Sequence, residues 1–384
     1  MLVACITGPD FQAAKNQLLK TEGLCDAVEI RHDLIEGDTS QLITSLPLVD
    51  CKEIPTYHNF DETPEDLEAL LASMKPAPIV KIATMANCIT DSLRMLDLVR
   101  RHPHVAGMCM GPQGEITRIL APVYGSPLTF ASVGPPAAPG QMSVEDLLKC
   151  YHFKRLSPST KVFGLMGNPI TQSPSHKTHN AYFREHGIDA VYVKMCVEER
   201  ELSHFFHFVK RLDFKGLSVT IPYKERIFDF IDHFEEKAAE IGAVNTLTIG
   251  AEIVGSNTDA DGAMDVLEKQ IPIRDARIVI LGGGGSSKAI SYEAKKRGGH
   301  VTICSRRFGN LHTIPTYDVL ITTLPVEVDH DPIPGSVVFD INFKREASRL
   351  IERARSKGCQ VILGEEMFQA QAALQFARWD QIPS

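Results

Sequence analysis

The run Arg277-Ile278-Val279-Ile280-Leu281-Gly282-Gly283-Gly284-Gly285-Ser286-Ser287-Lys288 carries a clear structural pattern. Its first five residues predict a buried strand, and the segment after the glycines, 289–297, predicts a helix. Glycines at such a junction let the backbone come close to a phosphate, which the N-terminus of the helix then holds. A glycine run alone is a weak signal, but the flanking strand and helix predict a nucleotide-binding α/β unit.

The same alternation of short apolar runs and longer amphipathic segments extends through the chain, as is typical of α/β folds with parallel strands. The turn-rich run 157–160 predicts a linker. We therefore expect three domains: 1–156, then 161–267 completed by a C-terminal helix at 365–384, and 273–364. In the first domain we expect a helix at 143–153 and strands at 2–7, 27–31, 54–58, 79–83, 105–109 and 127–132.

Composition narrows the class of protein. The chain has 384 residues, a hydrophobic content of 43% and a net charge of -8. The negative charge argues against a nucleic-acid or anionic-membrane partner. No apolar run reaches the ~20 residues of a membrane span, and the strand-like start at Leu2 leaves no room for a leader. The nine scattered cysteines lack a Cys-x-x-Cys pair, which predicts reduced thiols and a cytoplasmic protein.

Lys81 lies in an apolar run, 78–84, where a buried ammonium costs several kcal/mol unless it is paired or loses its proton. A deprotonated lysine is a nucleophile that forms a Schiff base with a ketone. His58, on the preceding expected strand, could remove a proton beside the imine and protonate a leaving hydroxyl. Arg118 could clamp a carboxylate, and Glu29 and Arg31 could hold hydroxyls. Such residues at strand ends are more often structural, so the residues alone leave both interpretations open.

The middle domain carries polar loops where strands are expected to end, and these would line one cleft at the carboxyl edge of a sheet. Lys224 and Asp259 could form a charged pair that passes a proton to an oxygen while hydride reaches its carbon. A surface salt bridge is the alternative for either residue alone. The other polar residues of these loops are Ser173, Ser175, Ser218, Thr220 and Asn245.

The end of the strand after the glycine loop discriminates between cofactors. An NAD site would place Asp or Glu there, whereas this chain has Ser305-Arg306-Arg307. Guanidinium groups suit a 2′-phosphate, so we predict NADP, with a solvated basic turn as the alternative. The histidines lack ligand spacing, so no metal site is predicted. The expected cofactor-binding residues are Gly282, Gly284, Gly285, Ser286, Ser305, Arg306 and Arg307.

The first domain resembles type I 3-dehydroquinate dehydratases. The matching motifs are Glu29-Ile30-Arg31-His32-Asp33, Tyr57-His58-Asn59-Phe60, Lys81-Ile82-Ala83-Thr84, Arg118 and Ala138-Pro139-Gly140-Gln141. The resemblance implies a (β/α)8 barrel in which Lys81 forms the imine and His58 is the general acid and base. It further implies that Arg118, Gln141, Glu29 and Arg31 bind the substrate carboxylate and hydroxyls.

This domain departs from the family pattern in two places. Ala137 stands where the family usually carries a lid serine. The sequence between Asp33 and Ile54 has room for one helix at most, where the family has two further strands and an arginine near the substrate carboxylate. We therefore expect a shortened barrel of about six strands, whose missing strands would expose sheet edges.

The region from Val162 to Gln371 resembles the shikimate dehydrogenase family. The resemblance implies a pair of α/β domains, the second a Rossmann domain that binds NADP. It implies Lys224 and Asp259 as the catalytic pair. The implied shikimate binders are Ser173, Ser175, Thr220, Asn245 and Gln371, with Ser218 where many members carry asparagine. Arg306 matches the family and Arg307 is additional, and the stretch from Arg307 to Asp318 is short for the family.

The joint order of motifs resembles the bifunctional dehydroquinate dehydratase–shikimate dehydrogenases. It implies that the first part dehydrates 3-dehydroquinate and that the second reduces 3-dehydroshikimate to shikimate with NADPH. One alternative is a monofunctional dehydrogenase on an inactive barrel remnant, which the missing strands favour. Another is a non-catalytic sensor of shikimate-like acids. The partners expected are small-molecule substrates, with no nucleic acid and no membrane, and the sequence does not predict the oligomeric state.

Overall fold

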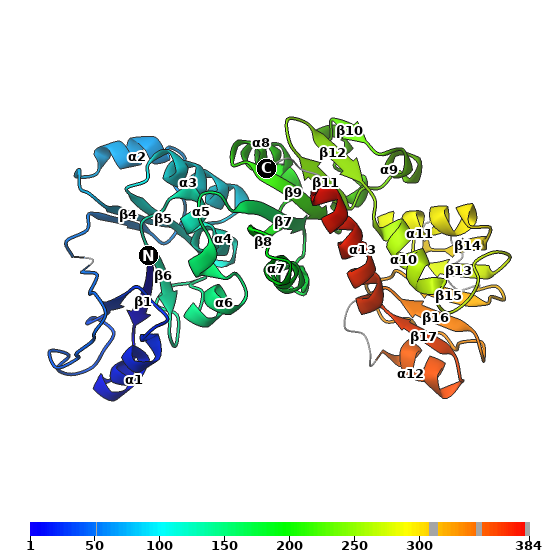
Figure 1. Cartoon of the computed structure of the whole chain (residues 1–384), viewed down its shortest axis with the longest axis horizontal. Coiled ribbons are helices and arrows are strands. Elements are labelled where there is room, and N and C mark those ends of the chain that lie inside the picture. The colour runs from blue at the N-terminus through cyan, green and yellow to red at the C-terminus, as the bar shows by residue number, and fades with distance from the viewer. Residues whose placement is uncertain (51, 307–313, 343–347, 381–384) are drawn as a thin grey trace. The chain divides into compact units, whose positions relative to one another are not determined.

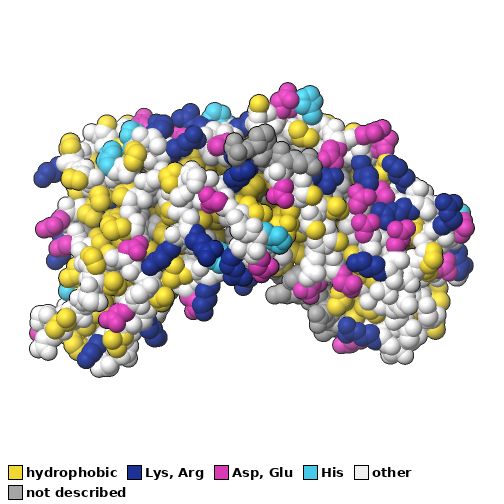
Figure 2. Space-filling model, in the orientation of Figure 1, with side chains coloured by type: hydrophobic (Ala, Val, Ile, Leu, Met, Phe, Trp, Pro, Cys, Tyr) yellow, Lys and Arg dark blue, Asp and Glu magenta, His cyan; other side chains and the backbone are white. Residues whose placement is uncertain are grey.

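The computed structural model describes residues 1–50, 52–306, 314–342 and 348–380 (Figure 1). The chain divides into two compact units, Met1–Phe214 and Lys215–Ser384, which are described separately. Among the described residues, no helix is long and apolar enough to cross a membrane. On the face drawn in Figure 2, acidic and basic side chains are interspersed, with no large area of one sign.

The described residues up to Ser132 form six strands, and all six were predicted from the sequence. They form two parallel three-stranded sheets, in the orders β2-β1-β6 and β3-β4-β5. Apolar side chains of both sheets share one core, to which Val3, Ala83, Met108 and Phe130 contribute. The strands are β1 (Leu2–Ile6), β2 (Ala27–Ile30), β3 (Thr56–Asn59), β4 (Val80–Met85), β5 (Val105–Met110) and β6 (Thr129–Ser132).

The shortened barrel of about six strands expected from the sequence takes the form, among the described residues, of two three-stranded sheets with a common interior. A short segment lies beside β2, where a complete barrel would place its next strand. The Val28 amide donates to the Pro47 carbonyl at 2.9 Å, and the Val49 amide donates to the Val28 carbonyl at 2.9 Å. These two bonds use backbone N–H and C=O groups of β2 that would otherwise have no partner at the sheet edge where the further strands are missing.

Helices follow the strands of this region as the βα pattern predicts. The Ser143 hydroxyl caps α6 (Val144–Lys149) by accepting a hydrogen bond from the Asp146 amide. The predicted helix at 143–153 is therefore shorter than expected, and a separate 3-10 turn (Phe153–Arg155) follows it. The other helices are α1 (Phe11–Thr21), α2 (Leu67–Ser73), α3 (Ile89–Arg101), α4 (Glu115–Ile119) and α5 (Ala121–Tyr124).

The first unit also contains the beginning of the next expected domain. Strand β7 (Lys161–Gly167) pairs in parallel with β8 (Ala190–Cys196), and α7 (Ser175–Glu185) connects them. Helix α8 (Leu202–Arg211) packs against α3, where the Arg211 guanidinium donates to the Asp97 carboxylate at 2.6 Å. Residues 1–156 and 161–214 are thus held in one compact unit by packing and an ion pair.

The second unit begins within β9 (Phe214–Val219) and continues with antiparallel β11 (Thr246–Ile249) and β12 (Ile253–Ser256). The strand β10 (His233–Phe234) and the helices α9 (Glu236–Ile241) and α10 (Asp259–Leu267) complete this part.

A five-stranded parallel sheet follows in the order β14-β13-β15-β16-β17, as a Rossmann domain predicts. Helix α13 (Gly364–Trp379) packs on α10, and Trp379 lies directly on Gly216, where a Cβ atom would come within 2.3 Å of its indole nitrogen. The remaining elements are β13 (Arg277–Leu281), α11 (Gly285–Lys296), β14 (His300–Cys304), β15 (Val319–Thr322), β16 (Val337–Asp340), α12 (Arg349–Ser356) and β17 (Gln360–Leu363).

Candidate active sites

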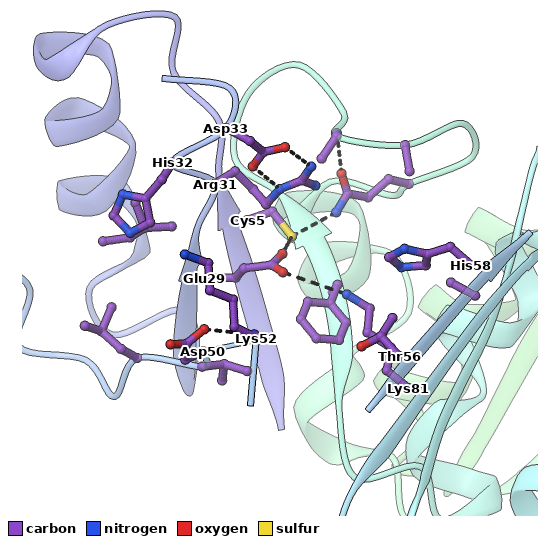
Figure 3. A pocket seen from close by; sticks show the side chains of 18 of the residues that line it. Cys5, Glu29, Arg31, His32, Asp33, Asp50, Lys52, Thr56, His58 and Lys81 are labelled. Atoms are coloured by element: carbon purple, nitrogen blue, oxygen red, sulfur yellow. Dashed lines mark hydrogen bonds and ion pairs between the residues drawn. The ribbon is translucent and has the colours of Figure 1, made fainter. Parts of the chain in front are cut away.

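A cavity of about 790 Å³ lies in the first unit and opens among the strands of the two sheets (Figure 3). All six residues that the sequence analysis assigned to the dehydratase site line this cavity: Glu29, Arg31, His58, Lys81, Arg118 and Gln141. Glu29, His58 and Lys81 lie on parallel strands whose inward-facing positions share one interior. Arg31 follows β2, Arg118 lies on α4, and Gln141 lies in the loop between β6 and α6.

Lys81 is 8% exposed and lines this cavity from β4. Its Nζ atom lies 3.8 Å from the Glu29 carboxylate and 4.0 Å from the centre of the Phe130 ring. A carboxylate and an aromatic face both stabilise positive charge in a site with little water. The arrangement therefore suits a lysine whose nitrogen becomes a cationic iminium.

Cys5 is a pocket residue that the sequence analysis missed. Its thiol donates to the second Glu29 oxygen at 3.1 Å and accepts from the Gln141 amide at 3.1 Å. Gln141 is fixed at its other end, because its carbonyl accepts from the Ala137 amide at 2.6 Å. Burial raises the pKa of the Cys5 thiol, so it stays a neutral hydrogen-bonding group. Alternation along β1 could have placed Cys5 on the inner face, but nothing in the sequence names its partners.

His58 lies on β3, on the same face of the sheet as Lys81. Lys81 is paired in register with Thr56, and His58 follows two residues later, so both side chains point into the cavity. Partial burial, helped by the positive charges of Lys81 and Arg31, lowers the pKa of His58. The imidazole is therefore neutral near pH 7 and able to accept a proton.

The two arginines of the pocket have different surroundings. Arg31 forms a two-point ion pair with Asp33, with distances of 2.8 and 2.6 Å. Arg118 is 3% exposed, and its Nη1 atom donates to the Phe130 carbonyl at 3.3 Å. Its Nε atom has no partner among the described residues, and burial lowers its pKa. Arg118 is thus the guanidinium that a substrate carboxylate would satisfy best.

The segment that replaces the missing strands also contributes to the wall of the cavity. Its side chains here include His32, Thr39, Ser40, Asp50 and Lys52. Figure 3 shows His32, Asp50 and Lys52 on the side of the cavity formed by β2 and this segment. His32 was quoted only as part of the motif 29–33, and none of these residues was predicted as a site residue, because the segment has no strand or helix pattern that would fix the direction of its side chains.

The second unit brings Lys224 and Asp259 together as predicted. Lys224, in the 3-10 turn Tyr223–Glu225, donates to Asp259 Oδ2 at 2.5 Å and to Ser286 Oγ at 3.0 Å. Asp259 is 4% exposed and begins α10, where the helix N-terminus stabilises its negative charge. Its Oδ1 atom accepts from the Asn245 amide at 2.8 Å. The pair is therefore held from three elements of the second unit.

Gln371 lies on α13, and its carbonyl accepts from the Thr258 hydroxyl at 3.3 Å and from the Asn245 amide at 3.4 Å. Ser218 is buried and donates to Gln375 at 3.1 Å, which places its hydroxyl at the contact between β9 and α13. Thr220 follows β9 and is partly exposed.

Ser173 and Ser175 belong to the first unit, where their hydroxyls lie 2.8 Å apart at the start of α7. Thr220, Asn245 and Gln371 belong to the second unit. Their meeting around one substrate stays a prediction.

The glycine loop has the form that a nucleotide requires. It connects β13 to α11, and Gly282 has φ 127°, a left-handed conformation that favours glycine. A Cβ atom on Gly284, the residue before α11, would have open space around it, so the helix N-terminus is accessible to a phosphate. Ser305 and Arg306 follow β14 directly, and Arg306 is exposed. Arg307 lies outside the described residues.

Comparison with known proteins identifies two family regions. Residues 38–158 match the model for type I 3-dehydroquinase. Residues 165–247 match the model for the shikimate dehydrogenase substrate binding domain. The first match contains His58, Lys81, Arg118 and Gln141.

Two relatives extend over nearly the whole chain. The shikimate biosynthesis protein AroDE of Chlamydia pneumoniae is 32% identical, with 99% of this chain and 95% of the relative covered. A bifunctional 3-dehydroquinate dehydratase/shikimate dehydrogenase, chloroplastic, of Arabidopsis thaliana is 31% identical, with 98% of this chain and 72% of the relative covered. The first alignment spans 456 positions and this chain has 384 residues, so at least 72 positions face gaps in this chain. That difference agrees with the short segments seen in the sequence.

Solved structures match the dehydrogenase part. Shikimate dehydrogenase from Aquifex aeolicus is 31% identical with a TM-score of 0.54, covering 59% of this chain and 96% of that chain. A shikimate dehydrogenase in complex with NADP+ is 28% identical with a TM-score of 0.54, covering 59% of this chain and 92% of that chain. Together with the two relatives that span both parts, these matches show that the chain belongs to the family of bifunctional 3-dehydroquinate dehydratase/shikimate dehydrogenases.

Proposed function

We propose that this chain catalyses two consecutive reactions of the shikimate pathway: dehydration of 3-dehydroquinate to 3-dehydroshikimate, and reduction of that product to shikimate with NADPH. The observation that carries the proposal is Lys81, which is buried against Glu29 and Phe130 in a cavity that also contains His58. The family membership supports both reactions.

In the first reaction, the Lys81 amine attacks the ketone carbon and water leaves, giving an iminium that withdraws electrons from the neighbouring carbon. His58 removes a proton from that carbon and returns it to the departing hydroxyl, which leaves as water. Hydrolysis of the imine then releases the product and restores the lysine, so the net change is the loss of one water. The Glu29 carboxylate stabilises the cationic nitrogen, and Arg118 holds the substrate carboxylate.

In the second reaction, Lys224 donates a proton to the carbonyl oxygen of 3-dehydroshikimate as it becomes a hydroxyl. Asp259 holds the ammonium in place, and Asn245 fixes Asp259. Thr220, Gln371, Ser173, Ser175 and Ser218 are the proposed binders of the substrate carboxylate and hydroxyls.

NADPH supplies the hydride when bound. Its pyrophosphate would lie on the glycine loop at the start of α11, and Arg306 would face the 2′-phosphate. The residues of the loop fit this group because Gly284 leaves the N-terminus of α11 open.

We further propose the domain boundaries 1–156, 161–267 with the C-terminal helix, and 273–364. The cysteines within the described ranges are free thiols, which suits a reducing compartment, and we propose a cytoplasmic location.

Borohydride trapping tests the first reaction. Reduction of the enzyme in the presence of 3-dehydroquinate is expected to leave a stable adduct on the peptide that contains Lys81, and Lys81→Ala is expected to leave none. For the second reaction, NADPH oxidation with 3-dehydroshikimate is expected in the native protein and not in Lys224→Ala. An inactive barrel remnant would give no adduct while NADPH oxidation continues, and this result would reduce the proposal to the dehydrogenase.

A further inference from the structure

Ser286 belongs to the glycine loop by sequence, yet its hydroxyl contacts the catalytic pair of the dehydrogenase. We propose that Ser286 is a positioning residue, which fixes the Lys224 ammonium for proton transfer to the substrate. This inference rests on the proposed dehydrogenase function and adds a role that nucleotide binding does not require.

The three groups form a closed triangle of hydrogen bonds. Lys224 donates to Asp259 Oδ2 at 2.5 Å and to Ser286 Oγ at 3.0 Å, and Ser286 donates its own proton to Asp259 Oδ2 at 3.2 Å. An ammonium has three N–H groups, so two are engaged here by described residues and one is left for a substrate oxygen. The serine thereby removes the freedom of the ammonium to rotate around a single ion pair.

The start of helix α11, which contains Ser286, lies very close to Lys224. A Cβ atom on Gly285 would lie 2.9 Å from the Lys224 Cβ, so glycine permits the helix start to come this near. One turn later, Lys288 forms an ion pair with Glu225, the residue after Lys224. Because Glu225 is neutralised by Lys288, Asp259 is the carboxylate that acts on the Lys224 ammonium.

Ser286 also lies where the cofactor phosphate is expected. It is the second residue of α11, and the first four amides of a helix have no partner within the helix. Its amide is thus available to a phosphate on one side, while its hydroxyl holds Lys224 on the other. A single residue therefore connects the nucleotide loop to the proton donor.

The test compares Ser286→Ala, Ser286→Thr and Ser287→Ala in the full chain. Ser287 is the matched control, because it lies on the same turn but its hydroxyl donates to the Gly282 carbonyl at 2.9 Å and not to the pair. Steady-state kinetics would give kcat and both KM values for 3-dehydroshikimate reduction. Reductive methylation of Lys224 in the cofactor-free protein, followed by peptide mass spectrometry, gives a second measurement that does not depend on turnover.

We expect Ser286→Ala to lower kcat roughly tenfold, as for loss of a hydrogen bond to a charged group, with both KM values nearly unchanged. Lys224 should be methylated faster in Ser286→Ala than in the native protein, and Ser286→Thr should restore kcat and the slow methylation. Ser287→Ala should raise the KM for NADPH without changing the methylation rate.

Unchanged kcat and unchanged methylation in Ser286→Ala would overturn the inference, as would an effect confined to the KM for NADPH. If the native protein does not reduce 3-dehydroshikimate, the proposed function fails instead. The methylation rates would then still show whether Ser286 holds Lys224.

Discussion

Replacement of Arg118 by methionine should make the first unit more stable and its dehydratase much slower. The guanidinium is 3% exposed, its Nε atom has no partner among the described residues, and its Nη1 contact to the Phe130 carbonyl is long at 3.3 Å. No described carboxylate forms an ion pair with it. A buried charge with so few partners destabilises the ligand-free fold, because its desolvation is not offset. Replacing even paired buried charges by apolar residues of similar volume is neutral or stabilises proteins by about 1–4 kcal/mol.

The same change removes the group that we assign to the substrate carboxylate. Loss of a charge-assisted two-point contact costs about 3 kcal/mol or more in transition-state binding, so kcat/KM for 3-dehydroquinate should fall by at least about 100-fold. Arg118→Lys is the matched control, because it keeps a charge but loses the planar fork. Its kcat/KM for 3-dehydroquinate should lie between the values of the native protein and of Arg118→Met.

Stability is best followed by hydrogen exchange of peptides from β4 and β5, because the single tryptophan, Trp379, lies in the second unit and does not report on the first. Slower exchange together with lost dehydratase activity is the expected result for Arg118→Met. Faster exchange, or a kcat/KM within about tenfold of the native value, would show that the Arg118 guanidinium is not kept for a ligand.

Three further predictions follow from the surroundings of single residues. The neutral form of His58 is the base, and the pKa of His58 is lowered. Dehydratase kcat/KM should therefore fall on the acid side only below the ordinary histidine pKa of ~6.5. A fall that begins above this pH would contradict the assignment. Burial lowers the pKa of His176 to about 4, so the native fold should lose about 2 kcal/mol of stability between pH 7 and 5 as the unfolded chain takes up a proton. His176→Phe keeps a ring against Tyr151 and should lose less stability than the native protein between pH 7 and 5 in urea titrations. A loss equal to that of the native protein would contradict the assignment to His176. Cys5→Ala should lower dehydratase kcat roughly fivefold because Glu29 loses a donor, and Cys5→Ser should restore it; equal rates in the two variants would rule out this role.

The parts of the fold that repeat a local pattern could be predicted from the sequence. All six strands of the first region were predicted, most of them as short apolar runs between turn signals, whereas β3 is largely polar. The glycine loop was predicted for the same reason, since its strand, turn and helix are adjacent in the chain. For Lys224 and Asp259 the residues alone left a catalytic pair and a surface salt bridge both open, and the resemblance favoured the pair, because their contact joins two segments that are 35 residues apart.

What could not be predicted depends on contacts between distant segments. The segment 47–49 has no strand pattern, yet it pairs with Val28 because the neighbouring edge of β2 offers unsatisfied backbone groups. The helix expected at 143–153 ends at Lys149, although this stretch contains no glycine or proline that would predict the end. Ser286 was assigned to the cofactor from its loop, and its bonds to Lys224 and Asp259 became visible only when the helix start was placed beside them.

Whether one chain carries both activities is tested by supplying purified protein with 3-dehydroquinate and NADPH and following NADPH oxidation. Because only 3-dehydroshikimate is reduced, oxidation requires the dehydratase to act first. We expect oxidation by the native protein, none by Lys81→Ala until 3-dehydroshikimate is added, and none by Lys224→Ala with either compound. Oxidation by Lys81→Ala at the native rate with 3-dehydroquinate, or no oxidation by the native protein unless 3-dehydroshikimate is supplied, would contradict this expectation.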